Sequence, residues 1–520
     1  MASRGHQFST HDLTPAEFRK LGYQTVDMLT AFYEDIETRP VFPAKSEQTV
    51  EALFDEPLPE RGQNPETILR EWETKILPNA THNTSPRYFG YVMGSGTMMG
   101  TLAEALAAAV NMNTGGWKPA PAATEVERTV LSWLAELIGY DPDCGGLLTS
   151  GGTMANFVAI LTALRNTAEY DTTAGGLQSP TRTGRYTLYM ADHEGHSSIF
   201  RVADMLNLGR DAVRLVPSHD DLTMDTDALE TLLDADIENG DIPFCVIGQV
   251  GSINVSAIDP LPDIARICDE RGLWFHADGA CGAVGAMLPE FATKYEGLDR
   301  ADSITLDPHK WLYVPYECGA ILVREPDRLR RSFDMDAPYL HGTLPTAYEG
   351  HDFYQHGPQM SRGFRALKVW MSLKHYGVQG YRDLLRQNIE CAHHLDTLVR
   401  REPDLAAIQE PNLYIYSFRY VPADLGTIES LTAEQQDALD SYLDTLNQKI
   451  TDAIQESGLA FFGTSAIHGR TVLRFSICSH RTTLTDIEDV VRAIQNAGVA
   501  LDRADRPTLA RTYPVFAREE

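Results

Sequence analysis

The sequence contains no apolar run of the ~20 residues that a membrane-spanning helix needs. The segment from Met1 to Asp12 is polar and lacks the apolar stretch of a signal peptide. Cysteine is scarce, and the seven cysteines are scattered, lie mostly inside apolar runs and form no Cys-x-x-Cys pair. This pattern indicates reduced, buried thiols. We therefore expect a cytoplasmic protein.

Basic residues are also in deficit. The 44 lysines and arginines face 73 aspartates and glutamates, so the formal net charge is −29. A surface of this sign argues against a nucleic-acid partner. The acidic residues are spread along the chain rather than collected in a tail, which is typical of a well-solvated surface; adaptation to a salty cytoplasm is the alternative.

A chain of 520 residues can bury a large core and is too long for one small domain. In residues 1–85, apolar positions near helical spacing predict amphipathic helices over 14–38 and 64–80, without a core of their own. From 86 to 375, strand-like and helical segments alternate, which favours an α/β domain with a largely parallel sheet.

The remaining residues, 376–520, are predicted to form a smaller α+β domain. A helix over 361–375 is expected to lead into it. Within it, residues 413–419 and 471–478 alternate in polarity like strands. No internal repeat and no low-complexity linker interrupts the chain.

Lys310 stands in the run Asp307–Trp311, between the apolar segments 303–306 and 319–323 that predict buried strands. A lysine between buried segments is costly unless its amine is used. The strongest use of a part-buried amine is nucleophilic attack on an aldehyde, which forms a Schiff base. For this position alone, a lysine on a surface loop is the alternative.

Asp278 closes another predicted strand that begins at Leu273. Open α/β sheets bind ligands at the carboxyl ends of their strands. An enzyme that uses pyridoxal 5'-phosphate (PLP) needs one carboxylate against the pyridine nitrogen, so that the protonated ring can accept electrons. Taken alone, a strand-end aspartate that caps a loop is an equally good interpretation.

Two further motifs fit the same cofactor. A strand runs into the turn Ser150–Thr153, and a helix follows; glycines and a free helix N-terminus suit a phosphate group. His193 and His196 follow the strand-like segment 186–190, without a matching cysteine or carboxylate set that would indicate a metal site. One imidazole is instead expected to cover a flat ring, although His193 also fits a structural role.

In chain order, these motifs resemble those of the group II PLP-dependent amino-acid decarboxylases, and most closely the aromatic-L-amino-acid decarboxylases. The resemblance extends from about Thr14 to Arg492, and its most specific parts are Asp307–Trp311 and the block from Gly116 to Leu134. It implies the PLP-dependent fold type I, related to that of aspartate aminotransferase. It also implies decarboxylation of an L-amino acid to an amine and CO2.

The resemblance implies a role for each motif residue. Lys310 carries the cofactor, Asp278 pairs with the pyridine nitrogen, and His196 stacks on the ring. Ala280 packs on the other face. The phosphate is held by Gly151, Gly152, Thr153 and His309.

The resemblance further implies a homodimer with the active site at the subunit interface, onto which the N-terminal helices pack. Asp334–Gly342 is polar and rich in turn-forming residues, and it resembles the catalytic loop of the family. Tyr339 falls on the tyrosine that delivers a proton across the dimer interface. Relatives with phenylalanine at that position tend to make aldehydes, so Tyr339 favours plain decarboxylation.

The residues that the resemblance assigns to the substrate pocket are uncharged: Tyr91, Val92, Met93, Asn113, Gly115 and Ser361. Such a pocket predicts a neutral substrate with an aromatic or other bulky side chain, because a charged end would be left unpaired. Gly115 replaces a larger residue and is expected to leave room. Ile253 and Asp307 depart from the family pattern, and Asp307 is not assigned a phosphate contact because an acid beside phosphate is unfavourable.

Other functions stay open at this point. A PLP aminotransferase or an aldehyde synthase is the alternative enzyme, and Arg474 could be the carboxylate clamp of the former. A protein that keeps the fold for an interaction role, without the cofactor, is the alternative outside enzymes. The identity of the amine product does not follow from the sequence.

Overall fold

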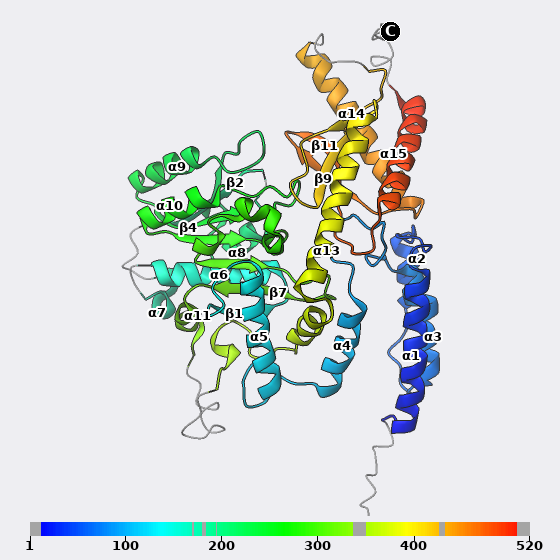
Figure 1. Cartoon of the computed structure of the whole chain (residues 1–520), viewed down its shortest axis with the longest axis horizontal. Helices are drawn as coiled ribbons and strands as arrows, with labels where there is room; N and C mark the ends of the chain where they lie inside the picture. Colours follow the sequence, from blue (N-terminus) through cyan, green and yellow to red (C-terminus); the bar gives the residue numbers. More distant parts are fainter. Residues whose placement is uncertain are drawn as a thin grey trace, which may run out of the picture.

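The computed structural model describes residues 12–168, 171–178, 184–193, 195–335, 350–425 and 432–506. Two sheets, each with its own layer of helices, lie at opposite ends of this structure (Figure 1). None of the helices in the described ranges is both long and apolar enough to cross a bilayer.

The larger sheet has seven strands in the order β1-β7-β6-β5-β4-β2-β3. Strands β3, β2, β4, β5 and β6 run parallel, whereas β7 is antiparallel to both of its neighbours. The prediction of a largely parallel α/β sheet is confirmed. The strands are β1 (Gly145–Thr149), β2 (Tyr186–Ala191), β3 (Val213–Val216), β4 (Ile242–Gln249), β5 (Trp274–Asp278), β6 (Ser303–Leu306) and β7 (Gly319–Val323).

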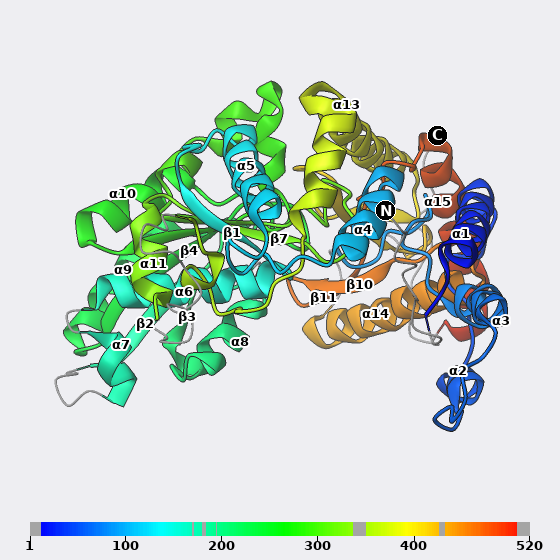
Figure 2. The ribbon, with the colours of Figure 1, turned by 90° about the horizontal axis from the view of Figure 1, so that it is seen from below.

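Helices cover both faces of this sheet, with α9 and α10 on one side and α6 and α8 on the other (Figure 2). Because both faces are covered, β2, β5, β6 and β7 are buried along their whole length, as continuous apolar strands of parallel sheets are. The helices of this domain are α5 (Pro121–Leu137), α6 (Gly152–Thr167), α7 (Thr172–Gly175), α8 (Ser198–Met205), α9 (Thr226–Glu238), α10 (Leu261–Arg271) and α11 (Pro326–Phe333).

The smaller sheet is antiparallel, in the order β10-β11-β9-β8, and packs against α14 (Ala433–Glu456) and α15 (Leu484–Asp505) around a separate apolar cluster. Two of its strands were predicted from alternation and are present at nearly the predicted places. The strands are β8 (Leu405–Ala407), β9 (Ile415–Tyr420), β10 (Gly463–Ile467) and β11 (Arg470–Ser476).

Helix α13 (Ala366–Arg401) joins the two sheets. The helix predicted over 361–375 begins five residues late and does not end at 375. It resumes after Gly377, whose φ of 65° and ψ of 171° are not helical, and runs on into the smaller domain. The prediction of its end was wrong because the glycine breaks the helix axis without ending the helical pattern.

The N-terminal helices are α1 (Pro15–Asp35), α2 (Glu47–Phe54) and α3 (Pro65–Glu71), followed by a π-helical and a 3-10 turn over 72–79. Thr14 caps α1 in a capping box with Glu17, which stabilises its start. None of the three helices has a buried residue. Helix α4 (Met98–Val110) packs on α13.

Candidate active site

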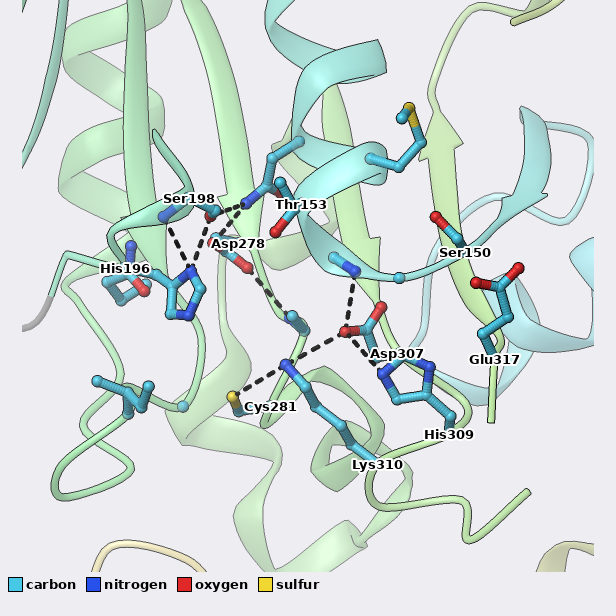
Figure 3. A pocket seen from close by; sticks show the side chains of 18 residues that line it. Ser150, Thr153, His196, Ser198, Asp278, Cys281, Asp307, His309, Lys310 and Glu317 are labelled. Atoms are coloured by element: carbon cyan, nitrogen blue, oxygen red, sulfur yellow. Dashed lines mark hydrogen bonds and ion pairs between the residues drawn. The ribbon is translucent and has the colours of Figure 1, made fainter. Parts of the chain in front are cut away.

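A cavity of about 370 Å³ opens at the carboxyl ends of β1, β4, β5 and β6, beside the N-terminus of α6 (Figure 3). This is where open α/β sheets bind ligands. All eight residues predicted to hold the cofactor line it: Gly151, Gly152, Thr153, His196, Asp278, Ala280, His309 and Lys310. Further lining residues were not predicted, among them Asn156, Ser198, Gln249, Cys281 and Glu317.

Lys310 reaches into this cavity from the turn after β6. Its Nζ lies 3.2 Å from Asp307 Oδ2 and 3.6 Å from Cys281 Sγ. Burial favours the neutral amine, but Cys281, Asp307 and Asp278 outweigh it and raise the pKa of Lys310 above its ordinary value. Without the cofactor, the lysine is therefore an ammonium ion that is paired with Asp307.

Asp307 is buried and turned toward the start of α6. Its Oδ2 accepts a hydrogen bond from the Gly152 N–H at 3.0 Å, in addition to the contact with Lys310. Its Oδ1 is buried and has no hydrogen-bond partner among the described residues. The acid thus takes up a backbone donor of the helix terminus that was predicted to hold phosphate.

His309 lies beside Asp307, with Nε2 at 3.5 Å from Oδ2. Its Nδ1 accepts the Cys318 N–H at 3.0 Å, so the ring proton is on Nε2. Burial lowers the pKa of His309 to about 4. The imidazole is therefore neutral near pH 7 and can donate toward the cavity.

Asp278 is 5% exposed and is held at both carboxylate oxygens. Oδ1 accepts the Ala280 N–H at 3.3 Å, and Oδ2 accepts an N–H of the Asn156 amide at 2.9 Å. The carboxylate therefore has a fixed direction at the end of β5, as a partner for a pyridine nitrogen requires.

Asn156 is the centre of the hydrogen bonds behind Asp278. Its Oδ1 accepts from Thr305 Oγ1 at 2.7 Å and lies 3.1 Å from His276 Nε2. Burial lowers the pKa of His276 to about 4, so this ring is neutral, and it donates from Nε2. The second Asn156 N–H reaches Ser198 Oγ at 3.2 Å. We did not predict Asn156, because one helical turn after a glycine turn it has the pattern of an ordinary helix residue.

His196 is fixed by Ser198, the first residue of α8. Its Nδ1 accepts the Ser198 N–H at 3.2 Å and lies 2.8 Å from Ser198 Oγ. Because Nδ1 accepts, the ring proton is on Nε2. Burial lowers the pKa of His196, against the opposing effect of the Asp278 carboxylate. His193, by contrast, is half exposed and does not line the cavity.

The turn at residues 151–153 fits a phosphate group. A Cβ added at Gly152 would lie 3.0 Å from Asp307 Oδ2 and 3.2 Å from the Ala280 Cβ, so glycine lets the chain come this close without a tight contact. Thr153 lies on the cavity wall at the start of the 16-residue helix α6, whose N-terminus favours anions. The Lys310 amine, the Asp278 carboxylate and the His196 ring thus meet around one cavity, together with the N-terminus of α6. PLP fits these residues.

The six predicted substrate-pocket residues do not line this cavity. Tyr91 is 63% exposed, and Asn113 and Ser361 are also exposed. Val92 is buried in the apolar core, and Met93 accepts a hydrogen bond from Tyr88. Their role as a substrate pocket stays a prediction.

The room expected beside Gly115 does not exist. A Cβ added at Gly115 would lie 2.3 Å from the carbonyl oxygen of Met360. This expectation was wrong because the space is filled by the backbone of a segment far along the chain. Asn113 Oδ1 is likewise engaged, since it accepts the N–H groups of Gly115 and Arg362.

Tyr339, the predicted proton donor, lies outside the described residues. The described chain stops at Met335 and resumes at Gly350, so the predicted role of Tyr339 rests on the sequence alone.

Comparisons with known proteins show a family and a fold. The profile described as "Pyridoxal-dependent decarboxylase conserved domain" matches residues 47–421. Aromatic-L-amino-acid decarboxylase of Bacillus atrophaeus is 28% identical over 484 residues, 93% of this chain and 96% of the relative. Histidine decarboxylase of Drosophila melanogaster is 30% identical over 519 residues, 97% of this chain and 58% of the relative. The crystal structure of Oryza sativa TDC with PLP and tryptamine has the same fold, with a TM-score of 0.85 at 24% identity over 95% of this chain and 100% of that one.

Proposed function

We propose that this chain, which belongs to the pyridoxal-dependent decarboxylase family and uses PLP to decarboxylate an amino acid, acts on a neutral L-amino acid with an aromatic or other bulky side chain. The observation that carries the proposal is the meeting of Lys310, Asp278 and His196 around one cavity at the N-terminus of α6.

The assignment of roles is part of the proposal. PLP, when bound, draws electrons from Cα of the amino acid, so that its carboxylate can leave as CO2. The Lys310 amine binds the cofactor aldehyde, and Asp278 holds the proton on the pyridine nitrogen. His196, which lines the cavity, would stack on the ring. Tyr339 returns a proton to Cα.

The lysine must give up a proton before it can attack an aldehyde. Asp307, 3.2 Å away, is the carboxylate that holds this ammonium in the free protein. We propose that Gly151, Gly152, Thr153 and His309 bind the phosphate. The Nε2–H of His309 and the terminus of α6 are donors there, which favours an anion over a neutral group.

The substrate class is supported by the uncharged character of Tyr91, Val92, Met93, Asn113, Gly115 and Ser361. A glutamate or a dibasic substrate would leave a charge desolvated among such residues. The names of the relatives, which decarboxylate aromatic amino acids and histidine, also support a ring-bearing substrate. Aromatic acids are the first choice, followed by methionine, leucine and valine.

A substrate screen tests this class directly. We expect CO2 release with PLP to be fastest, by kcat/KM, for tyrosine, dopa, tryptophan or phenylalanine, slower for methionine and leucine, and weakest for glutamate and ornithine. A clear preference for glutamate would contradict the neutral-substrate proposal while leaving the decarboxylase activity intact.

We propose further that two copies of the chain complete the site. Met98, Leu102, Leu106 and Val110 occur four residues apart on α4, and each is 51–55% exposed. Phe18 and Val26 of α1 and Ile68 of α3 are also exposed. Exposed apolar faces of this kind are typical of an interface. The exposed positions of Tyr91, Asn113 and Ser361 support a substrate pocket that a second copy closes.

A charged substitution on α4 tests the dimer. Leu106→Glu should shift sedimentation or light scattering from dimer to monomer and abolish activity, because the glutamate would be buried between subunits. Ile237→Glu is the matched control, since Ile237 of α9 is equally exposed (52%) but far from α4. A wild-type monomer with full activity at high dilution would contradict the proposal.

The alternative reactions are an aldehyde synthase and an aminotransferase. Arg474 of β11, a possible carboxylate clamp, donates to the Ile253 carbonyl at 3.1 Å, and Ile253 lines the cavity. Product analysis discriminates the reactions: a decarboxylase gives amine and CO2, an aldehyde synthase gives aldehyde, and an aminotransferase gives keto acid.

We propose a cytoplasmic location, because all seven cysteines are free thiols, as a reducing compartment maintains.

A further inference from the structure

We propose that Asn156 is a positioning residue, which joins the Asp278 carboxylate and the His196 imidazole into one hydrogen-bonded unit and so sets how both meet the cofactor ring. This inference rests on the proposed roles of Asp278 and His196. It adds a residue that neither holds the cofactor nor reacts.

The geometry of the Asn156 amide leaves it one arrangement. Its oxygen faces two donors, Thr305 Oγ1 and the Nε2–H of His276, at 2.7 and 3.1 Å. Its two N–H groups therefore face the two acceptors on the other side, Asp278 Oδ2 at 2.9 Å and Ser198 Oγ at 3.2 Å. All four hydrogen-bonding positions of the amide are used.

The proton on His276 follows from the direction of the Asn156 amide. Trp274 donates its indole N–H to Ser303 Oγ at 2.8 Å, and the Ser303 hydroxyl lies 2.9 Å from His276 Nδ1. Nδ1 also lies 3.2 Å from the Ser303 carbonyl oxygen, so the neighbours of Nδ1 alone do not decide the tautomer. Because the Asp278 carboxylate only accepts, the Asn156 N–H side faces it and the amide oxygen faces His276, which requires the ring proton on Nε2 and leaves Nδ1 to accept from the Ser303 hydroxyl. A buried network in which each group is satisfied is rigid.

The same unit reaches His196 through Ser198. Because the Ser198 hydroxyl accepts from Asn156, its own hydrogen is free for His196 Nδ1, 2.8 Å away. The bonds thus run without a break from Asp278 through Asn156 and Ser198 to His196. The predicted partner of the pyridine nitrogen and the predicted ring-stacking histidine cannot shift independently.

The test compares cofactor affinity and stability in Asn156→Leu, which keeps the branched shape and removes every polar atom. The PLP dissociation constant should rise roughly 10–100-fold, the loss seen when outer-shell partners of metal ligands are removed. Asn447→Leu is the matched control. Asn447 is also completely buried and bonds the backbone of Tyr420, but it lies in the smaller domain. The Asn447→Leu variant should have a lower melting temperature but an unchanged affinity for PLP.

A second readout uses the cofactor-free protein. In spectra of protein with nitrogen-15-labelled histidine, the His196 signal, identified by its absence from His196→Gln, should show the proton on Nε2. Asn156→Leu should change its Nδ1 signal, and Asn447→Leu should not.

If Asn156→Leu does not fold, Asn156→Asp carries the test, because it keeps the acceptor for Thr305 and His276. Its loss of PLP affinity relative to wild type should shrink as the pH falls, since a protonated carboxyl can again donate to Asp278.

The inference is overturned if Asn156→Leu binds PLP as wild type does, or if Asn447→Leu weakens binding equally. Should Asn156→Asp be the folded variant, unchanged affinity or a loss independent of pH would overturn it as well. Failure of the wild-type protein itself to bind PLP would instead overturn the proposed function.

Discussion

The residues predicted to hold the cofactor, here called the cofactor end, and the residues predicted to bind the substrate differ in their exposure to solvent in the single chain. Asp278, Asp307 and His309 are each at most 5% exposed, and every one has partners from other elements. Tyr91, in contrast, is 63% exposed. The apolar residues on the outer face of α4 are 51–55% exposed.

This difference has a physical reason. The cofactor residues lie at the ends of buried strands, where the sheet and its helices enclose them. The residues predicted for the substrate pocket belong to the connections before β1 and after α11. One chain is therefore enough to enclose the residues at the strand ends, whereas several of the residues predicted for the substrate pocket leave an exposed surface that the proposed second chain would cover.

The largest expected effect is at the cofactor end. Lys310→Ala should abolish activity and the fixation of PLP to the protein by borohydride, because the amine that attacks the aldehyde is gone. Lys368→Ala is the control, since Lys368 is a still more deeply buried lysine, which pairs with Glu104 outside the cavity. Peptide mapping that finds the cofactor on a lysine other than Lys310 would refute the assignment.

A smaller effect is expected from the substitution of Asp307. Asp307→Asn removes a negative charge beside the turn that should hold phosphate, and also the partner that keeps Lys310 protonated. The PLP dissociation constant should fall roughly tenfold, which corresponds to about 1.4 kcal/mol. Titration of the cofactor absorbance measures it. Weaker binding in Asp307→Asn would mean that the carboxylate supports the cofactor.

The sequence predicted well which residues meet at this cavity, and the reason is local. Lys310, Asp278 and the glycine turn each end or follow an apolar strand, so their place on one edge of the sheet follows from the pattern. Asn156 escaped prediction because its partners come from β5, β6 and α8, and nothing near it in the sequence marks these contacts.

The substrate side was less predictable, because its shape depends on distant backbone. The carbonyl of Met360 fills the space that Gly115 was expected to leave, although about 245 residues separate the two in the sequence. The helix predicted over 361–375 continues past Gly377 as α13, because both of its halves have apolar faces to bury.

The last expected effect is on acid stability rather than on the reaction. The pKa of His309 is about 4 in the folded protein instead of 6.5. Between these values only the unfolded chain binds the proton, so the free energy of unfolding falls as the pH drops from about 6.5 to about 4, by at most on the order of 3 kcal/mol.

His309→Asn keeps an acceptor for the Cys318 N–H and should flatten this pH dependence of the melting temperature in cofactor-free protein. His193→Asn, at a half-exposed histidine outside the cavity, should leave it unchanged. Equal slopes for wild type and His309→Asn would show that His309 is not neutralised by burial.

The most direct test of the account is a hybrid dimer of one Lys310→Ala chain and one Tyr339→Phe chain, co-expressed with different tags and purified by both. Each homodimer should release almost no amine. If a site takes Lys310 from one chain and Tyr339 from the other, the hybrid contains one intact site and should show about half of the wild-type rate per dimer. A hybrid as inactive as its two parents would show that each chain builds its whole site alone, and would contradict the shared site.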